Sequence, residues 1–320
     1  SHAAVVARGW GKPCVAGCES IRIDTNRNQF TVGEHTIKEG DWISVDGATG
    51  EVFLGQVPKI ETAFEKEKEL IKALDWADEI RKIGVLTNAD TPEDSIKARQ
   101  FGAKGIGLCR TEHMFFDQED EEISRRENVV KMILKSEVAA PLLRQIYALE
   151  TKERTPEEET ELSELKKKAE NEDVKEYQES LANLLPFQRK DFLGIFEAMD
   201  GYPVIIRLID PPMHEFLPPR EELLIEVTEL RCTGRDPEEL KKKEYLLQVV
   251  ESLWETNPML GLRGCRAGLM YPGLTEMQVQ AIMEAAVEVK KAGVDVHPEI
   301  MIPLTSHVNE MHAEHDKLKK

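Results

Sequence analysis

Short apolar runs alternate with turn-forming residues near the start of the chain. The clearest runs are residues 42–45 and 51–54, and a glycine-containing turn at 46–50 separates them. Apolar runs of this length, bounded by turn residues, are typical of strands. We therefore expect residues 1–57 to form a small β-rich unit that opens with a short helix at 3–8.

The next stretch, residues 58–82, changes in composition to glutamate, lysine, alanine and leucine. Its apolar markers are Ile60, Phe64, Leu70, Leu74 and Ile80. Apolar positions at this spacing indicate an amphipathic helix. We predict a helical linker between the β-rich unit and the rest of the chain.

From residue 83 onward, short apolar runs alternate with amphipathic helical stretches. This alternation is typical of βα units around a parallel sheet, and repeated units favour a TIM barrel. The candidate strands are residues 83–86, 105–108, 204–209, 300–304 and, more weakly, 260–263. Because a complete barrel needs eight strands, we expect residues 83–320 to form only the first part of a TIM (β/α)8 barrel. We also expect the natural polypeptide to continue beyond Lys320.

Two helix starts and one charged insert stand out in this second part. Thr91 precedes a proline and two acidic residues, which predicts a capped helix start, and a second long helix is expected from Thr275. Between them, residues 137–177 are highly charged and favour helix. Such charge patterns are typical of solvated helices, so we interpret this segment as a helical hairpin inserted into the barrel. A role in binding a partner is the alternative.

The charge of the chain limits its partners. It carries 60 acidic against 42 basic residues, a formal net charge of -18. A surface this acidic repels nucleic acid and anionic membranes, so we expect neither as a partner. The sequence has no apolar run that would span a bilayer and does not open with a signal peptide. An anionic substrate would need a local cluster of arginines acting against the overall field.

The cysteines and the C-terminal histidines predict no metal site. The cysteines are Cys14, Cys18, Cys109, Cys232 and Cys265. An odd number of scattered cysteines favours a reducing compartment, cytoplasmic or organellar, over a disulfide framework. No second pair follows Cys14 and Cys18 at zinc-like spacing, so we do not expect zinc. His307, His312 and His315 have a helical spacing that permits a transition metal, but we do not expect one there.

Three arginines follow apolar runs where barrel strands are expected to end: Arg110, Arg207 and Arg263. Active sites in this fold lie at the C-terminal ends of the strands. Guanidinium groups are always charged and bind in a bidentate manner, which suits a small substrate that carries a carboxylate and a phosphate. The alternative for each arginine is a structural ion pair, for example of Arg207 with Asp210 or of Arg110 with Glu112.

His2 directly precedes the predicted short helix. The free backbone N–H groups and the dipole at a helix N-terminus favour an anion, so a phosphorylated imidazole would be stabilised there. Arg8 lies farther along the same helix and would shield that charge if it folds back. The alternative is a solvated or capping histidine without a catalytic role.

Four strings of the sequence resemble the phosphoenolpyruvate-utilising enzyme family. The first, Ser1 to Val15, is similar to the phosphohistidine loop of that family. The other three, residues 105–116, 204–216 and 257–266, are similar to its substrate-binding barrel. The resemblance implies an α/β architecture: the C-terminal half of a swivelling phosphohistidine domain, a helical linker, and the first part of a TIM barrel.

The resemblance also implies roles for individual residues. It identifies His2 as the residue that carries phosphate, and Arg110, Arg207 and Arg263 as residues that bind phosphoenolpyruvate and pyruvate. The family uses Mg²⁺, whose ligands are expected beyond Lys320, so no metal ligand is expected within this chain. None of the cysteines lies in the proton-donor motif of the family.

The residues most resemble family members that interconvert ATP, phosphate and pyruvate with AMP, pyrophosphate and phosphoenolpyruvate. ATP and phosphate would bind in a domain absent here, so the chain alone is expected to be inactive, and a homodimer would form through the barrel. One alternative is a family member that makes phosphoenolpyruvate without using inorganic phosphate. The other is a non-catalytic phosphocarrier or interaction fragment.

Overall fold

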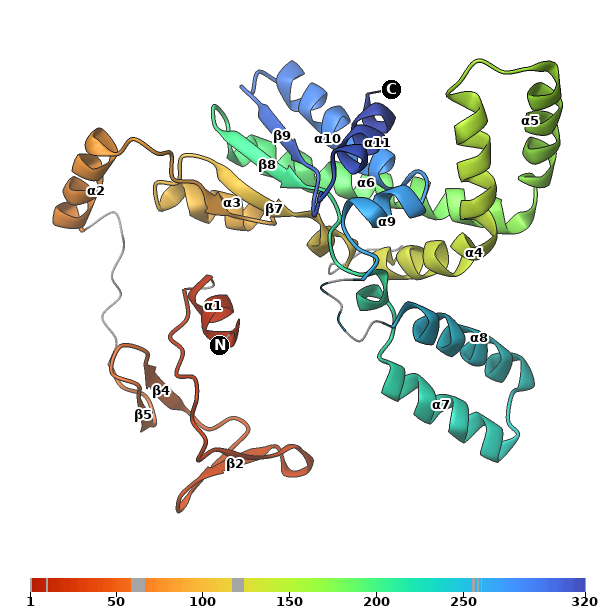
Figure 1. The fold of residues 1–320 in the computed structure, drawn as a ribbon. Coiled ribbons are helices and arrows are strands. Elements are labelled where there is room, and N and C mark those ends of the chain that lie inside the picture. Colours follow the sequence, from red (N-terminus) through yellow and green to blue (C-terminus); the bar gives the residue numbers. More distant parts are fainter. Residues whose placement is uncertain are drawn as a thin grey trace. The chain divides into compact units, whose positions relative to one another are not determined.

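The computed structural model describes residues 2–9, 11–58, 67–116, 124–254, 257, 259 and 261–319 of the chain (Figure 1). The chain folds into two compact units, Ser1–Ile80 and Arg81–Lys320. Among the described residues, no helix is both long and apolar enough to cross a membrane.

The first unit is built from short antiparallel strands. Its elements in chain order are α1 (His2–Gly9), β1 (Arg22–Asp24), β2 (Gln29–Val32), β3 (His35–Lys38), β4 (Ile43–Asp46), β5 (Glu51–Leu54) and α2 (Lys68–Ile80). β1, β2 and β3 form a three-stranded sheet in that order, and β4 and β5 form a separate hairpin. Gly33 begins the tight turn between β2 and β3 with a φ of 57°, a conformation that glycine adopts without strain.

This unit buries little apolar surface of its own. Among its described residues only Ile37 and Ser44 are buried, and apolar side chains such as Ile23 and Trp42 are exposed. The strands and the short opening helix expected from the sequence are present. The predicted linker contains α2, while residues 59–66 lie outside the described residues.

The second unit is organised around a parallel sheet. Its strands are β6 (Thr87–Asn88), β7 (Ile106–Arg110), β8 (Pro203–Arg207) and β9 (His297–Met301), which pair in sequential order. Parallel neighbours require a crossover between them, and helices supply each crossover here. Arg110 pairs with Arg207, and Arg207 pairs with Met301, so three strands end level at one edge. The expected mixed α/β fold with a parallel sheet is confirmed.

Helices make up most of the rest of this unit. They are α3 (Pro92–Gln100), α4 (Arg125–Glu150), α5 (Pro156–Lys168), α6 (Glu172–Ala198), α7 (Arg220–Thr233), α8 (Pro237–Leu253), α9 (Cys265–Met270), α10 (Leu274–Lys291) and α11 (Val308–Leu318). The short 3-10 helices η3 (Thr111–Phe115) and η4 (Met213–Phe216) follow β7 and β8. Ile106 of β7 and Ile206 of β8 share a buried apolar core with Phe192 of α6 and Ile282 of α10. α6 and α10 therefore pack against one face of the sheet.

A second apolar core lies among the long helices beside the sheet. Val129 of α4, Tyr177 of α6, Val227 of α7 and Val250 of α8 are all buried in it. Buried apolar side chains are the main favourable contribution to folding. The long connections after β7 and β8 therefore form a packed helical layer and do more than return the chain to the sheet.

The charged segment 137–177 belongs to this helical layer. It comprises the end of α4, all of α5 and the start of α6. Helix is confirmed, but the interpretation as a solvated hairpin is wrong in part. Ile146 and Leu149 of α4 are buried together with Leu162 and Leu165 of α5. Two apolar residues one turn apart are enough to dock a helix whose other positions are charged.

Two of the predicted strands are absent from the structure, and a third, predicted at 300–304, is found at His297–Met301. The run 83–86 is not a strand, because pairing with β7 begins at Thr87, whose N–H donates to the Gly105 carbonyl. Residues 261–263 form no strand either, and Leu260 lies outside the described residues. Apolar character alone did not distinguish a paired strand from the loop beside it.

The predicted helix starts are close to the observed ones. The Thr91 hydroxyl accepts a hydrogen bond from the Asp94 N–H at 3.1 Å, and Pro92 lies in the first turn of α3, so the predicted cap is confirmed. The second helix was expected from Thr275, and α10 begins at Leu274.

Candidate functional site

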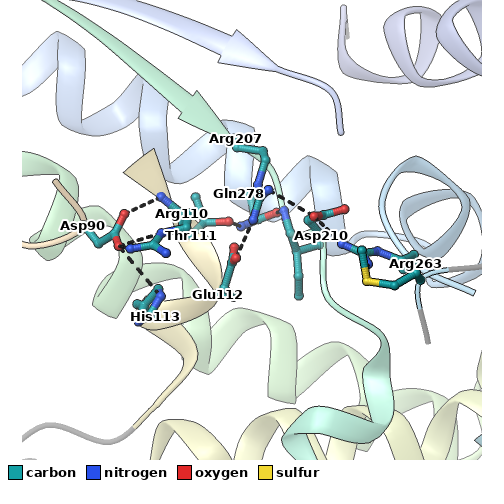
Figure 2. Close-up of polar contacts among 11 residues, drawn as sticks. Asp90, Arg110, Thr111, Glu112, His113, Arg207, Asp210, Arg263 and Gln278 are labelled. Carbon is teal, nitrogen blue, oxygen red and sulfur yellow. Dashed lines mark hydrogen bonds and ion pairs between the residues drawn. The ribbon is translucent and has the colours of Figure 1, made fainter. Parts of the chain in front are cut away.

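Three arginines meet at the edge of the sheet where the parallel strands end. Arg110 and Arg207 are the last residues of β7 and β8 and are direct partners in the sheet register. Arg263 lies in the segment before α9, and Figure 2 shows its side chain directed toward Asp210, which also faces Arg207. The structure thus brings together the three arginines that the sequence indicated.

Arg110 is held by Asp90, a residue that follows β6. The Asp90 carboxylate accepts hydrogen bonds from the Arg110 backbone N–H at 2.7 Å, from Nε at 2.9 Å and from Nη2 at 2.6 Å. His113 Nε2 lies 3.7 Å from the same carboxylate. The hydrogen bond to Asp90 raises the pKa of Arg110, which keeps the guanidinium charged. The alternative pairing of Arg110 with Glu112 is wrong.

Glu112, Arg207, Asp210 and Arg263 form one continuous chain of ion pairs. Arg207 Nη2 donates to Glu112 Oε1 at 2.5 Å, and its Nη1 lies 3.1 Å from Asp210 Oδ2. Arg263 Nη2 donates to the same Asp210 oxygen at 2.6 Å. The side chains of Arg207 and Arg263 are only 21% and 12% exposed. The suggested pair of Arg207 with Asp210 is therefore present, and Asp210 also holds Arg263.

Four buried polar atoms in this chain of ion pairs have no hydrogen-bond partner. They are Arg207 Nε, Arg263 Nε, Glu112 Oε2 and Asp210 Oδ1. Buried donors and acceptors are nearly always paired, and an unpaired one costs about 1–3 kcal/mol. Oxygens of a bound carboxylate or phosphate would serve as acceptors for the two Nε–H donors. The ion pairs that Arg207 and Arg263 form with carboxylates are thus compatible with a role of these arginines in ligand binding.

Two family models match the chain. The model described as the PEP-binding domain of PEP-utilising enzymes matches residues 64–320, and the model of their mobile domain matches residues 1–50. The chain belongs to the PEP-utilising enzyme family. The arginine edge falls within the PEP-binding match, and His2 falls within the mobile-domain match.

Curated relatives match this PEP-utilising chain along all or nearly all of its length. Pyruvate, phosphate dikinase 1 (chloroplastic) of Arabidopsis thaliana is 46% identical over 322 residues, covering 100% of this chain and 28% of the relative. The chloroplastic pyruvate, phosphate dikinase of Flaveria trinervia is 46% identical over 312 residues, covering 97% and 28%. Pyruvate, phosphate dikinase 2 of Zea mays is 44% identical over 311 residues, covering 97% and 30%. The chain thus spans less than a third of the length of these relatives.

His2 is the first residue of α1. This is the backbone position expected for a histidine that places an anion at a helix N-terminus. The side chains of His2 and Arg8 lie outside the described residues, so their predicted contact stays a prediction. The role of His2 as phosphate carrier in this PEP-utilising enzyme likewise stays a prediction.

Several of the other histidines make separate local contacts. Within the described part of the chain, no group of three or more His, Cys, Asp or Glu side chains is placed to hold a metal ion. His307 caps α11 by accepting a hydrogen bond from the Asn309 N–H at 3.2 Å, and His315 Nδ1 lies 3.4 Å from Asp316. His214, in the η4 turn, packs against Trp254 with ring centroids 5.8 Å apart.

All five cysteines are free thiols. Cys109 lies on β7 next to Arg110 and is fully buried. Burial raises the pKa of the Cys109 thiol, and the nearby charges of Asp90 and Glu112 raise it further. The thiol therefore stays protonated, which makes it a packing residue and a poor nucleophile.

Two polar residues of the site were missed by the sequence analysis. The only sequence signal for Asp90 was its position as an acidic residue shortly after a strand. Gln278 of α10 is separated by 167 positions from Thr111, to whose Oγ1 it donates at 2.8 Å. Its side-chain oxygen accepts a hydrogen bond from the Ile209 N–H at 3.0 Å. The only sequence signal for Gln278 was its position as a glutamine on the apolar side of a helix.

Proposed function

We propose that this chain forms the phosphohistidine and substrate-binding part of a pyruvate, phosphate dikinase. The intact enzyme interconverts ATP, phosphate and pyruvate with AMP, pyrophosphate and phosphoenolpyruvate. The identity of 46% to a named dikinase across the whole chain supports this reaction. The match to the PEP-binding domain supports pyruvate and phosphoenolpyruvate as the ligands of the second unit.

The convergence of Arg110, Arg207 and Arg263 at one sheet edge carries the proposal. Phosphoenolpyruvate bears a carboxylate and a phosphate, and both groups are bound well by guanidinium forks. The C-terminal edge of parallel strands is also where such folds bind their substrates. The Nε–H groups of Arg207 and Arg263 are buried and unpaired, so an anion whose binding shifts these side chains would supply the missing acceptors.

The finer fold belongs to the same proposal: the second unit is the first part of a TIM barrel. Sequential pairing of β6, β7, β8 and β9 is the order that such a barrel requires. α6 and α10 pack on one face of the sheet, while Ile205 and Arg207 on the other face are partly exposed. The first unit would be the C-terminal half of the swivelling domain, and its mobile-domain match supports this assignment.

In the half-reaction served by this chain, we assign the transferred phosphate to His2. An imidazole nitrogen attacks phosphorus, so that a nitrogen–phosphorus bond forms while the enol oxygen–phosphorus bond of phosphoenolpyruvate breaks. The electron pair stays on the enolate of pyruvate, which takes a proton from a general acid to give pyruvate. The arginines stabilise the charge that develops on the phosphate and enolate oxygens.

Radiolabelled phosphoenolpyruvate tests this assignment in the full native polypeptide. We expect the wild-type protein to take up acid-labile label with release of pyruvate, and His2→Ala to take up none. His35→Ala is the matched control, because His35 is an exposed histidine on β3 of the same unit and should leave labelling unchanged. Full labelling of the His2→Ala protein would refute the assignment.

A second measurement separates a dikinase from a phosphoenolpyruvate synthase. The full native polypeptide is incubated with ATP and pyruvate, with and without inorganic phosphate. We expect phosphoenolpyruvate to form only when phosphate is present, and pyrophosphate to accumulate in equal amount. Formation of phosphoenolpyruvate without phosphate would favour the synthase.

Mg²⁺ is also part of the proposed function, and when bound it would stabilise negative charge on phosphate and enolate oxygens. The described residues contain no cluster that fits a metal ion, so no metal ligand is assigned among them and no step is derived through the metal. EDTA should abolish labelling by phosphoenolpyruvate, and added Mg²⁺ should restore it. Labelling that persists in EDTA would exclude the requirement.

The proposal also covers assembly and compartment. ATP and phosphate would bind in another part of the intact enzyme, and two copies would associate through the second unit. Light scattering of the native protein should then give twice the mass of one polypeptide. The chloroplastic names of several relatives support a reducing organellar compartment, with the cytoplasm as the alternative.

A further inference from the structure

We propose that Gln278 is a positioning residue that fixes the spacing of the strand ends carrying Arg110 and Arg207. This inference rests on the proposed phosphoenolpyruvate site. Gln278 is fully buried on α10, a helix that packs against the sheet. In Figure 2 its side chain lies beside Thr111, between Arg110 and Arg207.

The Gln278 amide connects two neighbouring strands through both of its polar atoms. Its Nε2 donates to Thr111 Oγ1 at 2.8 Å, and its Oε1 accepts from the Ile209 N–H at 3.0 Å. Thr111 is fully buried and follows the end of β7, while Ile209 is buried and follows the end of β8. One side chain from α10 therefore joins the segments that leave two adjacent strands.

The bridge begins where the sheet stops. Arg110 and Arg207 are the last partners between β7 and β8, and the next N–H on the β8 side, that of Leu208, donates to Met301 of β9 at 3.0 Å. The Ile209 N–H would be buried without a partner if Gln278 were absent. Because buried backbone donors are almost always paired, the amide of Gln278 fixes the backbone at this point.

The joined residues are adjacent in sequence to the ion-pair chain. Thr111 lies between Arg110 and Glu112, and Ile209 immediately precedes Asp210. The bond between Arg207 and Glu112 crosses from one strand end to the other at 2.5 Å, so its geometry depends on the separation of those ends. A displacement of about 1 Å at a binding group is enough to weaken binding strongly. Gln278 would act through the arginines and would not itself contact the substrate.

The test compares two buried glutamines in the full native polypeptide. Gln278→Met removes both hydrogen bonds at similar volume. Gln188→Met is the matched control, because Gln188 is also fully buried in a helix of this unit but neither of its amide atoms has a hydrogen-bond partner. We expect Gln278→Met to raise the KM and the dissociation constant for phosphoenolpyruvate about tenfold, and Gln188→Met to leave both unchanged.

The half-reaction with ATP separates a positioning role from a general loss of structure, because only a general loss of structure would slow it. Formation of AMP and pyrophosphate from ATP and phosphate should proceed at the wild-type rate in Gln278→Met, because that half-reaction does not use the arginine edge. Thr111→Val removes one of the two bonds and should weaken binding of phosphoenolpyruvate less. When Thr111→Val is combined with Gln278→Met, binding of phosphoenolpyruvate should be no weaker than in Gln278→Met alone. A serine at position 111 keeps the hydroxyl, so Thr111→Ser should bind phosphoenolpyruvate as the wild type does.

The possible outcomes separate the inference from the function on which it rests. If the wild-type protein binds phosphoenolpyruvate and Gln278→Met binds it equally well, the positioning role is overturned and the proposed function stands. Full additivity of Gln278→Met and Thr111→Val would also overturn the bridge. If Gln278→Met does not fold, Thr111→Val with its serine rescue decides the question. A wild-type protein that neither binds phosphoenolpyruvate nor accepts its phosphate overturns both.

Discussion

Arg125 and Arg207 each pair with a carboxylate in the second unit, but the surroundings of the two guanidinium groups differ. Arg125 is fully buried, and its Nη1 donates to Asp191 Oδ2 at 2.5 Å and to the Met114 carbonyl at 2.9 Å. Its guanidinium also lies over the ring of Phe187, 4.9 Å from the ring centroid. Arg207 is 21% exposed at the strand-end edge, and its Nε has no partner.

The difference indicates which ion pairs build the fold and which remain available to a ligand. Arg125 joins the start of α4 to α6, and its contacts are with carboxylate, carbonyl and aromatic groups of the protein. Arg207 and its neighbours keep unpaired donors and acceptors although they are largely buried. The presence of an ion pair therefore does not separate a structural arginine from a binding one. Unpaired hydrogen-bonding atoms at the ends of parallel strands, where such folds bind their substrates, do.

The largest effect is expected from breaking the fully buried pair. Arg125→Met leaves the Asp191 carboxylate buried without its partner, which should lower the free energy of unfolding by about 3–5 kcal/mol. Arg189→Met is the control on α6, because the pairs of Arg189 with Glu284 and Glu288 are exposed and their loss should change stability by less than about 1 kcal/mol. Urea unfolding followed by circular dichroism measures both. Equal stability losses would remove the basis of the comparison.

Arg207→Met should have the opposite profile, with a large effect on binding and a smaller one on stability. Loss of charge-assisted hydrogen bonds to phosphoenolpyruvate should weaken its binding about 100-fold. Arg207→Lys should restore little of the binding, because an ammonium group cannot replace the planar guanidinium and its paired donors. Arg231→Met, which removes an exposed arginine paired with Glu244, should bind as the wild type does. Calorimetric titration of the full polypeptide would show whether binding and stability separate in this way.

A smaller effect is expected from the carboxylate that holds Arg110. Asp90 accepts from the Arg110 backbone N–H with one oxygen and from its guanidinium with the other. Asp90→Asn keeps a single acceptor oxygen, so the KM for phosphoenolpyruvate should rise about tenfold. Glu93→Gln, at an exposed position of the following helix, serves as the control. An unchanged KM in the Asp90→Asn protein would show that Arg110 binds substrate without this support, or not at all.

The sequence predicted strand-end positions for Arg110 and Arg207 and the pair of Arg207 with Asp210. It did not indicate Asp90 as a partner of Arg110 or Glu112 as a partner of Arg207. Arg263 was also expected at the end of a strand, but it lies in a segment without a strand before α9. Arg110 and Arg207 each end an apolar run, so a local pattern was enough to place them at strand ends. Their contacts depend on which strands and helices become neighbours. Asp90 is 20 positions from Arg110. Glu112 is 95 positions from Arg207. Charge and spacing favoured the nearer pair of Arg110 with Glu112, whereas the parallel pairing of β6 with β7 selected Asp90 instead.

The sequence likewise did not show those features of the fold that depend on which elements become neighbours. Parallel βα units were recognisable because buried strands form short apolar runs between amphipathic helices. The run 83–86 was mistaken for a strand because Ile83 and Val85 are apolar, although both are exposed in the structure. The burial of Leu162 and Leu165 was missed because charged residues dominate α5. Composition describes the average environment of a helix and does not show the few positions that dock it.

The smallest effect in the series is expected from a pair at the surface, Arg266 and Glu310. Glu310 accepts hydrogen bonds from the Ser306 and His307 backbone N–H groups and from Arg266, and these bonds lower the pKa of its carboxyl from 4.5 to about 2. A carboxyl whose pKa is lower in the folded state stabilises the fold above its ordinary pKa, and this contribution is lost as the pH falls through the folded value. Glu310→Gln should therefore lower the thermal unfolding midpoint slightly at neutral pH. The difference from the wild type should shrink as the pH falls from 4.5 toward 2. Parallel unfolding curves of both proteins across this range provide the measurement, and a difference that stays constant with pH would show that the charge of Glu310 does not stabilise the start of α11.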